Sequence, residues 1–379
     1  MTVGISAAGR RVLALPRRAA TASAEEGIIS LDRGDPGCAT PDILIRAMTQ
    51  AMRGGHTHYG NLDGDPELRT HIASSGPLRS SPVSPEHVVI TPGSTAGLSS
   101  VLMALVDPGD RVVILDPTYA AYAEQIALVG GVPVRIPFQP DGHLDLAAVH
   151  HACSAGARLL ILCHPASPTG IVFTRDELTA LGDVLAGSDT YLLADEAYAD
   201  VVYDGRPFTS TLAVPNLRPR LIMSRTLSKS YAMTGWRIGY LVLPPALADP
   251  VNLVHRTYNL VANAAVQRAA LTALKAGPEL LTPMLSTYVE HRDAVMAWMR
   301  KTGLLTAPTP EATFYVFARY NHPMSSVDLV HHLTSYGVRV RAGSYDGPNG
   351  ENHLRICFAA PAPVLTEGLR RIAKGLSAL

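Results

Sequence analysis

Short apolar runs alternate with longer helix-like stretches through most of this chain, and this alternation limits its possible folds more than any other feature. Apolar runs occur at residues 88–90, 111–115, 159–163, 191–194 and 221–224. Uniformly apolar strands separated by helices are typical of a mostly parallel sheet with helices on both faces. We therefore predict an α/β fold of three layers, helix, sheet and helix. Ligands of such sheets bind beyond the carboxyl ends of the strands.

The pattern changes after about residue 280. A long helix-like segment from residue 282 is followed by strand patterns at 313–318, 338–341 and 353–357, a helix near 327–335 and a final helix. This α+β character predicts a second, smaller domain. We expect residues 1–28 to form a partly extended arm. The predicted division is therefore 1–45 for the arm and part of the small domain, 46–280 for the large domain and 281–379 for the small domain.

Composition excludes several classes of partner. Lys+Arg and Asp+Glu both number 32 among 379 residues, so the net charge is zero. We expect neither a nucleic-acid nor an anionic-membrane partner. No run approaches the roughly 20 apolar residues of a membrane helix. Residues 12–16, between two arginine pairs, are too short for the core of a signal peptide. Four scattered cysteines favour a reducing, cytoplasmic location.

Lys229 lies in an unusual segment, residues 224–239, with hydroxyl side chains around it and Arg237 eight residues later. A single lysine is usually a solvated surface residue. This segment, however, resembles the cofactor-lysine signature of the class I/II aminotransferases, the fold-type-I enzymes that depend on pyridoxal 5′-phosphate (PLP). The resemblance implies that Lys229 joins PLP as a Schiff base and that Thr226 and Arg237 bind its phosphate. A buried amine with a lowered pKa is nucleophilic near neutrality, and a guanidinium binds phosphate at two points.

A second matching segment, Ala-Asp-Glu-Ala-Tyr at 194–198, ends an apolar run. An Asp in this place is also a common helix cap. The resemblance implies that Asp195 pairs with the pyridine nitrogen and keeps it protonated, so that the ring withdraws electrons from the substrate Cα. It also implies that Tyr198 donates to the 3′ oxygen of the ring. Lys229, Asp195 and Tyr198 are thus the predicted catalytic residues.

Two further turns match the family after predicted strands. The turn at 91–97 leaves backbone N–H groups at a helix start, which favours a phosphate, although such turns are often plain strand–helix connections. The resemblance assigns phosphate binding there to Ser94 and Thr95. It also places Tyr119 against the face of the PLP ring, where aromatic stacking would keep the ring flat. Packing in the core is the alternative for Tyr119.

Tyr59 precedes Gly64 by five residues, with a Leu-Arg pair following, as in the family. In the family this Tyr reaches the phosphate of the other subunit. The resemblance therefore implies a homodimer with shared active sites. The alternative is an ordinary surface aromatic residue.

Near the C-terminus, Arg355 lies in an apolar strand pattern, and a buried Arg needs a partner. The resemblance makes it the residue that binds the substrate α-carboxylate, for which its planar fork suits two-point contact. Gly34 matches the early loop that lines the same carboxylate. Phe314 and Tyr315 match an aromatic pair at the entry to the small domain and fit a core equally well.

The resemblance runs from about Arg11 to the last helix, with three departures. Ser167 stands where the family usually has an Asn that donates to the 3′ oxygen, and a lost hydrogen bond to a charged group matters by roughly 1.5–3 kcal/mol. Ala342 replaces a usual Pro, and Gly37-Cys38 follows Pro36 where Asp-Phe is usual. These departures put ordinary amino acids as substrates in doubt.

The first predicted function is transamination of an α-amino acid, with Lys229 moving the proton between Cα and the cofactor. The alternative is elimination, replacement or C–C bond formation in specialised metabolism, with the same fold and cofactor. A PLP-fold regulator is disfavoured by the zero charge and the absence of an added domain. No metal site is expected, because adjacent histidines such as 150–151 and 331–332 point about 100° apart on a helix.

Overall fold

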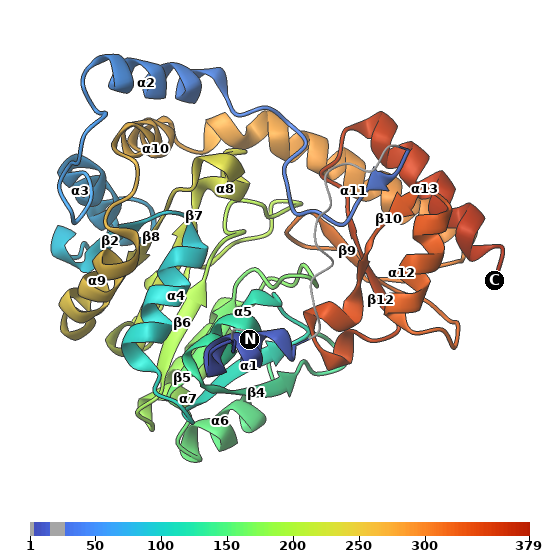
Figure 1. Ribbon diagram of the computed structural model, residues 1–379, viewed down its shortest axis with the longest axis horizontal. Helices are drawn as coiled ribbons and strands as arrows, with labels where there is room; N and C mark the ends of the chain where they lie inside the picture. The colour runs from blue at the N-terminus through green and yellow to red at the C-terminus, as the bar shows by residue number, and fades with distance from the viewer. Residues whose placement is uncertain (1–3, 16–26) are drawn as a thin grey trace.

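The computed structural model describes residues 4–15 and 27–379, and its centre is one seven-stranded sheet (Figure 1). The strands lie in the order β2 (Val88–Thr91), β8 (Gly239–Val242), β7 (Leu221–Thr226), β6 (Tyr191–Asp195), β5 (Leu159–Cys163), β3 (Arg111–Asp116) and β4 (Val132–Pro137). Strand β8 is antiparallel to both of its neighbours, and the other neighbouring pairs are parallel. The mostly parallel sheet is therefore confirmed.

Helices bury both faces of this sheet, because the strands are apolar on both sides; all five residues of β5 are buried. One face packs against α4 (Ser94–Leu105), α5 (Ala121–Val129) and α9 (Pro245–Asn259). The other packs against α3 (Pro66–Ser74), α6 (Leu146–Ser154), α7 (Arg175–Ala186) and α10 (Ala264–Ala276). The predicted three-layer arrangement is confirmed, and it sets the carboxyl ends of the parallel strands along one edge.

A separate hydrophobic cluster forms from the C-terminal elements, drawn orange to red in Figure 1. A three-stranded antiparallel sheet has the order β11 (Arg341–Ala342), β12 (His353–Cys357) and β9 (Tyr315–Arg319). Helices α11 (Thr282–Thr302), α12 (Ser326–Ser335) and α13 (Ala362–Leu376) pack with it. A domain boundary near residue 280 stays a prediction.

The single strand predicted at 338–341 is wrong. It is split into β10 (Val338–Arg339), which pairs in parallel with β1 (Ile29–Ser30), and β11, which pairs with β12. Val340 is buried between the two short strands. One apolar run therefore serves two sheets, and the pairing with β1 brings the N-terminal chain to the C-terminal elements.

The predicted strand list also missed both β4 and β8. Strand β4 lies at the edge of the sheet and contains two prolines, which weaken a strand pattern in the sequence. Strand β8 has only four residues, directly after the turn that carries Arg237.

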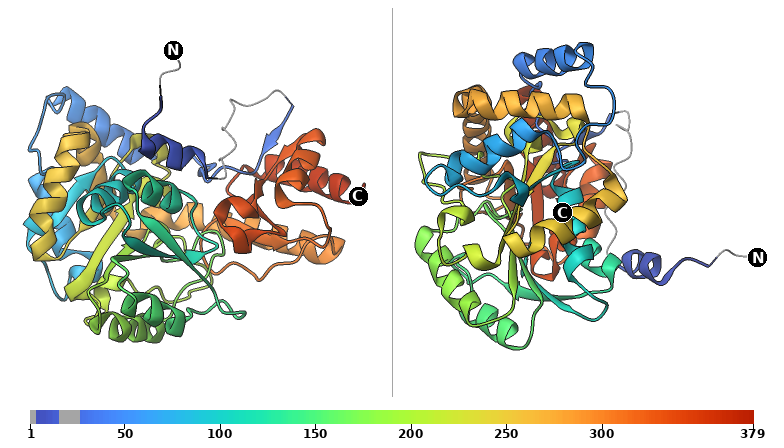
Figure 2. Two further views of the ribbon diagram at one scale, coloured as in Figure 1. Left: turned by 60° about the horizontal axis from the view of Figure 1, so that its bottom comes forward. Right: turned by 90° about the vertical axis from the view of Figure 1, so that its left-hand side faces the viewer.

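The N-terminal segment differs from the expected extended arm where it is described. Residues Ala7–Leu13 form helix α1, and the Ser6 side chain accepts from the Gly9 N–H at its start. Arg11 donates to the carbonyls of Ala127 and Leu128 at 2.6 and 3.1 Å, which ties α1 to the end of α5. Figure 2 shows α1 reaching outward from the body of the molecule. The rest of the expected arm, residues 1–3 and 16–26, lies outside the described residues.

In residues 4–15 and 27–379, no helix combines the length and the apolar character that crossing a membrane requires.

Candidate active site

One cavity of about 280 Å³ lies at the carboxyl ends of the parallel strands, where strand patterns predicted a ligand. The predicted residues that line it are Gly34, Ser94, Thr95, Tyr119, Ser167, Asp195, Tyr198, Thr226, Lys229, Arg237 and Arg355. They come from segments that span more than 300 positions of the sequence. Tyr59 is the one predicted site residue outside this cavity.

Lys229 lies on the short helix α8 (Leu227–Ser230), which follows strand β7 directly. The Thr226 side chain accepts from the Ser228 N–H at 3.2 Å and so fixes the start of this helix. The Lys229 Nζ donates to the backbone carbonyl of Gly34. Burial lowers the pKa of Lys229 to about 8. Near neutrality this amine is therefore far more often uncharged, and nucleophilic, than a solvated lysine.

Asp195 is the last residue of β6 and is almost fully buried. Its Oδ2 accepts from the Tyr122 hydroxyl at 2.8 Å, and its Oδ1 has no hydrogen-bond partner among the described residues. Burial raises the pKa of Asp195 to about 6, and the Tyr122 hydrogen bond opposes this rise. A protonated ring nitrogen would satisfy Oδ1 and favour the carboxylate form, so this position fits PLP.

The opposite end of the cavity suits a phosphate group. Helix α4 starts after Gly93, which has no side chain to cap the first N–H groups, so these are open to an anion. The Arg237 guanidinium lies against Gly93, where a Cβ would be 2.4 Å from Nη2. Its Nη1 donates to the Thr234 carbonyl at 2.9 Å. The uncapped helix start and the guanidinium together fit a bound phosphate dianion.

Arg355, on β12, lines the cavity together with Asp195, Lys229 and Arg237. Its Nη2 donates to the Asp32 carbonyl at 2.9 Å, and its Cζ lies 4.3 Å from the ring centroid of Tyr315. A buried arginine was expected to need a partner. Asp346 is one such partner within the chain, because its Oδ2 lies 3.7 Å from the Arg355 Nη1. Burial alone would lower the pKa of Arg355, but Asp346, Tyr315, Tyr198 and Cys357 together outweigh burial and the pKa is raised. Its Nε has no partner among the described residues and remains for a carboxylate.

Four tyrosines and Ser167 complete the cavity wall. The Tyr198 hydroxyl donates to that of Tyr315 at 3.1 Å, so Tyr315 belongs to the cavity as well as to the core. Tyr119 contacts Tyr122 edge to face, with ring centroids 5.4 Å apart. Ser167 is buried in the wall, and its substitution for the usual Asn leaves a shorter donor there.

Sequence reasoning missed several residues of the cavity. Those not predicted are Tyr122, Cys163, Ala197, Ser228 and Thr234. For Tyr122 a signal was present, since it lies only three residues after Tyr119, which was predicted to contact the cofactor. A metal was not expected, and no group of three or more His, Cys, Asp or Glu side chains within the described ranges could hold one.

The chain is similar to known proteins over most of its length. The family model for aminotransferase class I and II matches residues 26–372, so the chain belongs to this family. It is an aminotransferase that acts on amino acids, and the prediction of transamination is confirmed over the elimination and regulator alternatives.

Individual relatives show how far the likeness extends. A putative aminotransferase of Bacillus subtilis, YugH, is 31% identical over 94% of this chain and 93% of its own. The arginine–pyruvate transaminase AruH of Pseudomonas aeruginosa is 30% identical over 93% and 92%. A double mutant of the Thermus thermophilus aspartate aminotransferase superposes with a TM-score of 0.89 at 28% identity, covering 98% of this chain and 100% of that one.

Proposed function

We propose that Lys229 binds PLP covalently and that the chain transaminates an α-amino acid whose carboxylate Arg355 holds. One observation carries this proposal. Lys229, Asp195, Arg237 and Arg355 converge on a single cavity, and each faces a different chemical group that PLP or an amino acid would bring. The class I and II family implies PLP, whose protonated ring withdraws electrons from the substrate Cα when bound.

Three residues of the cavity would have separate roles at the cofactor ring and the substrate Cα. Asp195, held by Tyr122, would keep the proton on the ring nitrogen. Tyr198, linked to Tyr315, would donate to the 3′ oxygen. Lys229, whose pKa burial lowers to about 8, would take the proton from the substrate Cα and pass it to the 4′ carbon of the cofactor.

The phosphate end would hold the cofactor in place. Arg237 and the N–H groups at the start of α4 would bind the phosphate, with hydroxyls of Ser94, Thr95 and Thr226 around it. Tyr119 would lie against the ring.

Substrate recognition would begin with the group that all α-amino acids share. The relatives named for arginine and for aspartate differ in the side chain of the substrate, but both substrates have an α-carboxylate. Arg355 and Gly34 would bind this group, so the same contacts serve whichever amino acid is used.

We also propose a homodimer with shared active sites, supported by the surface around Tyr59. Tyr59 is 82% exposed, and most of the other large exposed apolar side chains lie on α2 (Asp42–Arg53), on the loop that carries Tyr59 and on or just after α9. These side chains are Ile43, Ile45, Met52, Leu62, Leu253, Tyr258 and Leu260. An exposed apolar surface of this kind commonly marks an interface.

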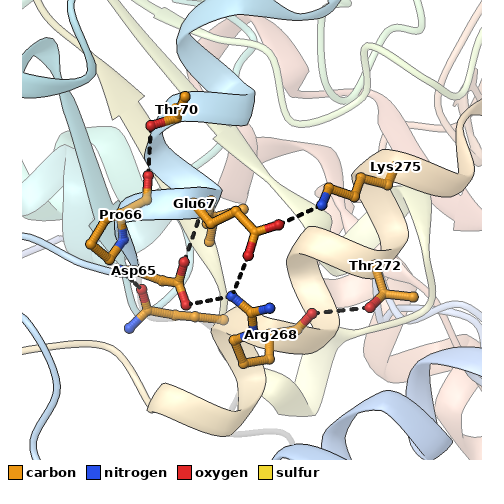
Figure 3. A network of polar contacts seen from close by, with 9 residues as sticks. Asp65, Pro66, Glu67, Thr70, Arg268, Thr272 and Lys275 are labelled. Atoms are coloured by element: carbon orange, nitrogen blue, oxygen red, sulfur yellow. Dashed lines mark hydrogen bonds and ion pairs between the residues drawn. The ribbon is translucent and has the colours of Figure 1, made fainter.

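Polar contacts hold the loop of Tyr59 in place. Asp63 pairs with Arg256 and accepts from Asn252 at 2.7 Å, both on α9. Figure 3 shows the next contacts along the chain, where Arg268 bridges Asp65 and Glu67 at 3.1 and 2.9 Å. The loop is thus fixed to α9 and α10, with Tyr59 exposed and outside its own cavity, where a partner subunit could contact it.

A cytoplasmic location is proposed on the chemistry of the cysteines. Cys38, Cys153, Cys163 and Cys357 are all free thiols. Free thiols are usual in a reducing compartment.

Borohydride reduction of the purified protein tests the assignment of Lys229. Reduction should fix the cofactor on the peptide that contains Lys229, as read by mass spectrometry after digestion. The same treatment of Lys229→Ala should leave no labelled peptide. A label on Lys275, Lys301 or Lys374 would overturn the proposal.

A further inference from the structure

Two arginines lie directly opposite each other beside the active-site cavity. Arg341 on β11 and Arg355 on β12 are register partners, and their side chains are only 11% and 8% exposed. Like charges that face each other across two strands destabilise the pair, and burial increases the cost. A buried carboxylate between them is therefore required.

Asp346 supplies this carboxylate. Its side chain is fully buried, and it lies on the turn that connects β11 to β12. Its Oδ1 accepts from the Arg341 Nε at 3.0 Å, and its Oδ2 lies 3.7 Å from the Arg355 Nη1. Arg355 is thus held on three sides, by Asp346, by the Asp32 carbonyl and by the ring of Tyr315.

The backbone of the same residue contacts the opposite wall of the site. The Asp346 carbonyl accepts from the Thr118 N–H at 2.8 Å, next to Tyr119. Asn349 donates to Asp116 at 2.8 Å through its side chain, and Gly347 allows this close approach, since a Cβ there would be 1.7 Å from Asp116 Oδ1. The turn between β11 and β12 therefore connects Arg355 with the loop that follows β3.

We propose that Asp346 is a positioning residue for the substrate α-carboxylate: it orients the Arg355 guanidinium and fixes it relative to the loop of Tyr119. Asp346 touches neither the cofactor nor the reacting atoms, so it acts through Arg355. This inference rests on the proposed role of Arg355 and adds the residue that orients its guanidinium group. Asp346 lies outside the sequence motifs that predict the site.

The consequence is a specific effect on carboxylate recognition. Without Asp346 the two arginines repel each other, and Nη1 of Arg355 loses its partner. The guanidinium then no longer presents its free N–H groups in one fixed plane, which is the basis of two-point carboxylate binding. Cofactor binding should not change, because Arg237 and the start of α4 lie at the other end of the cavity.

Two amines of similar shape measure this effect on the holoenzyme. 2-Aminoisobutyrate carries a carboxylate where tert-butylamine carries a methyl group, and neither has a hydrogen on the carbon that bears the amine. Titration of each, followed by the absorbance of the bound cofactor, gives an affinity ratio that reports the contribution of the carboxylate alone. Asp346→Asn should lower this ratio roughly tenfold, about the effect of one weakened hydrogen bond to a charged group. Its PLP content should equal that of the wild type.

Two further variants complete the test. Asp176→Asn removes a carboxylate from the exposed start of α7 and should leave the ratio unchanged. The double variant Asp346→Ala/Arg341→Leu removes both members of the buried ion pair together and should also lower the ratio.

The possible contrary results separate the two proposals. An unchanged ratio in Asp346→Asn would overturn the positioning role while leaving Arg355 as the carboxylate residue. A raised ratio would also overturn it, and would show that Asp346 competes with the substrate. If the wild type itself does not prefer the carboxylate, the proposed role of Arg355 fails first. If neither Asp346 variant folds with PLP bound, Asp346 serves folding and the positioning role is overturned.

Discussion

The two ends of the active-site cavity are built in different ways. The proposed cofactor end uses residues at or just after the ends of adjacent strands, such as Asp195 on β6 and Lys229 after β7. The proposed substrate end combines Gly34, Tyr315 and Arg355, which lie far apart in the sequence and come together through buried contacts. The large sheet sets the first geometry, and the pairing of β9 with β12 together with a few polar contacts sets the second. Substitutions at the two ends should therefore fail differently.

The largest effect is expected from Lys229→Ala, which removes the proposed nucleophile and proton carrier together. Turnover should fall on the order of 10⁴-fold or more in a steady-state assay. Lys301→Ala, on the exposed end of α11, is the control and should retain wild-type turnover. Activity of Lys229→Ala within tenfold of the wild type would exclude this lysine.

Asp195→Ala should be the next most severe change at this end. It removes the buried carboxylate that Tyr122 holds, and loss of one preorganised charged group costs on the order of 10²–10³ in kcat. Tyr122→Phe keeps the carboxylate and should cost less, roughly tenfold. Equal, small effects in both variants would mean that Asp195 has only a structural role.

The pH dependence of cofactor attachment tests the proposed cofactor end separately from the substrate end, because Lys229 lies at the cofactor end. Burial lowers the pKa of Lys229 to about 8, and only the uncharged amine attacks. For cofactor-free protein mixed with PLP, the attachment rate should rise about tenfold per pH unit below pH 8 and level off above it. The absorbance of the mixture gives this rate. A rate that still rises tenfold per unit from pH 8.5 to pH 10 would contradict a lowered pKa.

Tyr59→Phe should have the smallest effect. It removes the one hydroxyl that would reach the partner's phosphate and keeps the aromatic ring. PLP should be held roughly tenfold more weakly, with an unchanged molecular mass by light scattering. A wild-type protein that is fully active as a monomer would refute the shared site.

The sequence predicts which residues meet at the proposed cofactor end because the information there is local. Lys229, Asp195 and Ser94 each follow an apolar run within a few residues, so a strand pattern and a short motif place them together. The prediction of a single strand at 338–341 failed because an apolar run can pair with one sheet or with two. Which of these occurs depends on distant segments, here β1 and β12.

The contacts between side chains were less accessible to prediction. Tyr122 is 73 residues from the Asp195 carboxylate that it holds. Asp346 is near Arg355 in sequence, but only the turn between β11 and β12 reveals that it lies between two arginines. Periodicity predicts burial and does not predict which buried charges meet.

The most direct test of the two-ended site is a crossed comparison of Arg237→Lys and Arg355→Lys. Lysine keeps the charge and loses the planar fork in both variants. For each variant, PLP affinity and kcat/KM for one amino acid are measured at saturating PLP. Arg355→Lys should lower kcat/KM by roughly tenfold to a hundredfold with unchanged PLP affinity, and Arg237→Lys should weaken PLP binding with a smaller loss of kcat/KM. If both variants lose the two properties in the same proportion, or Arg355→Lys keeps wild-type kcat/KM, the division between a cofactor end and a carboxylate end is wrong.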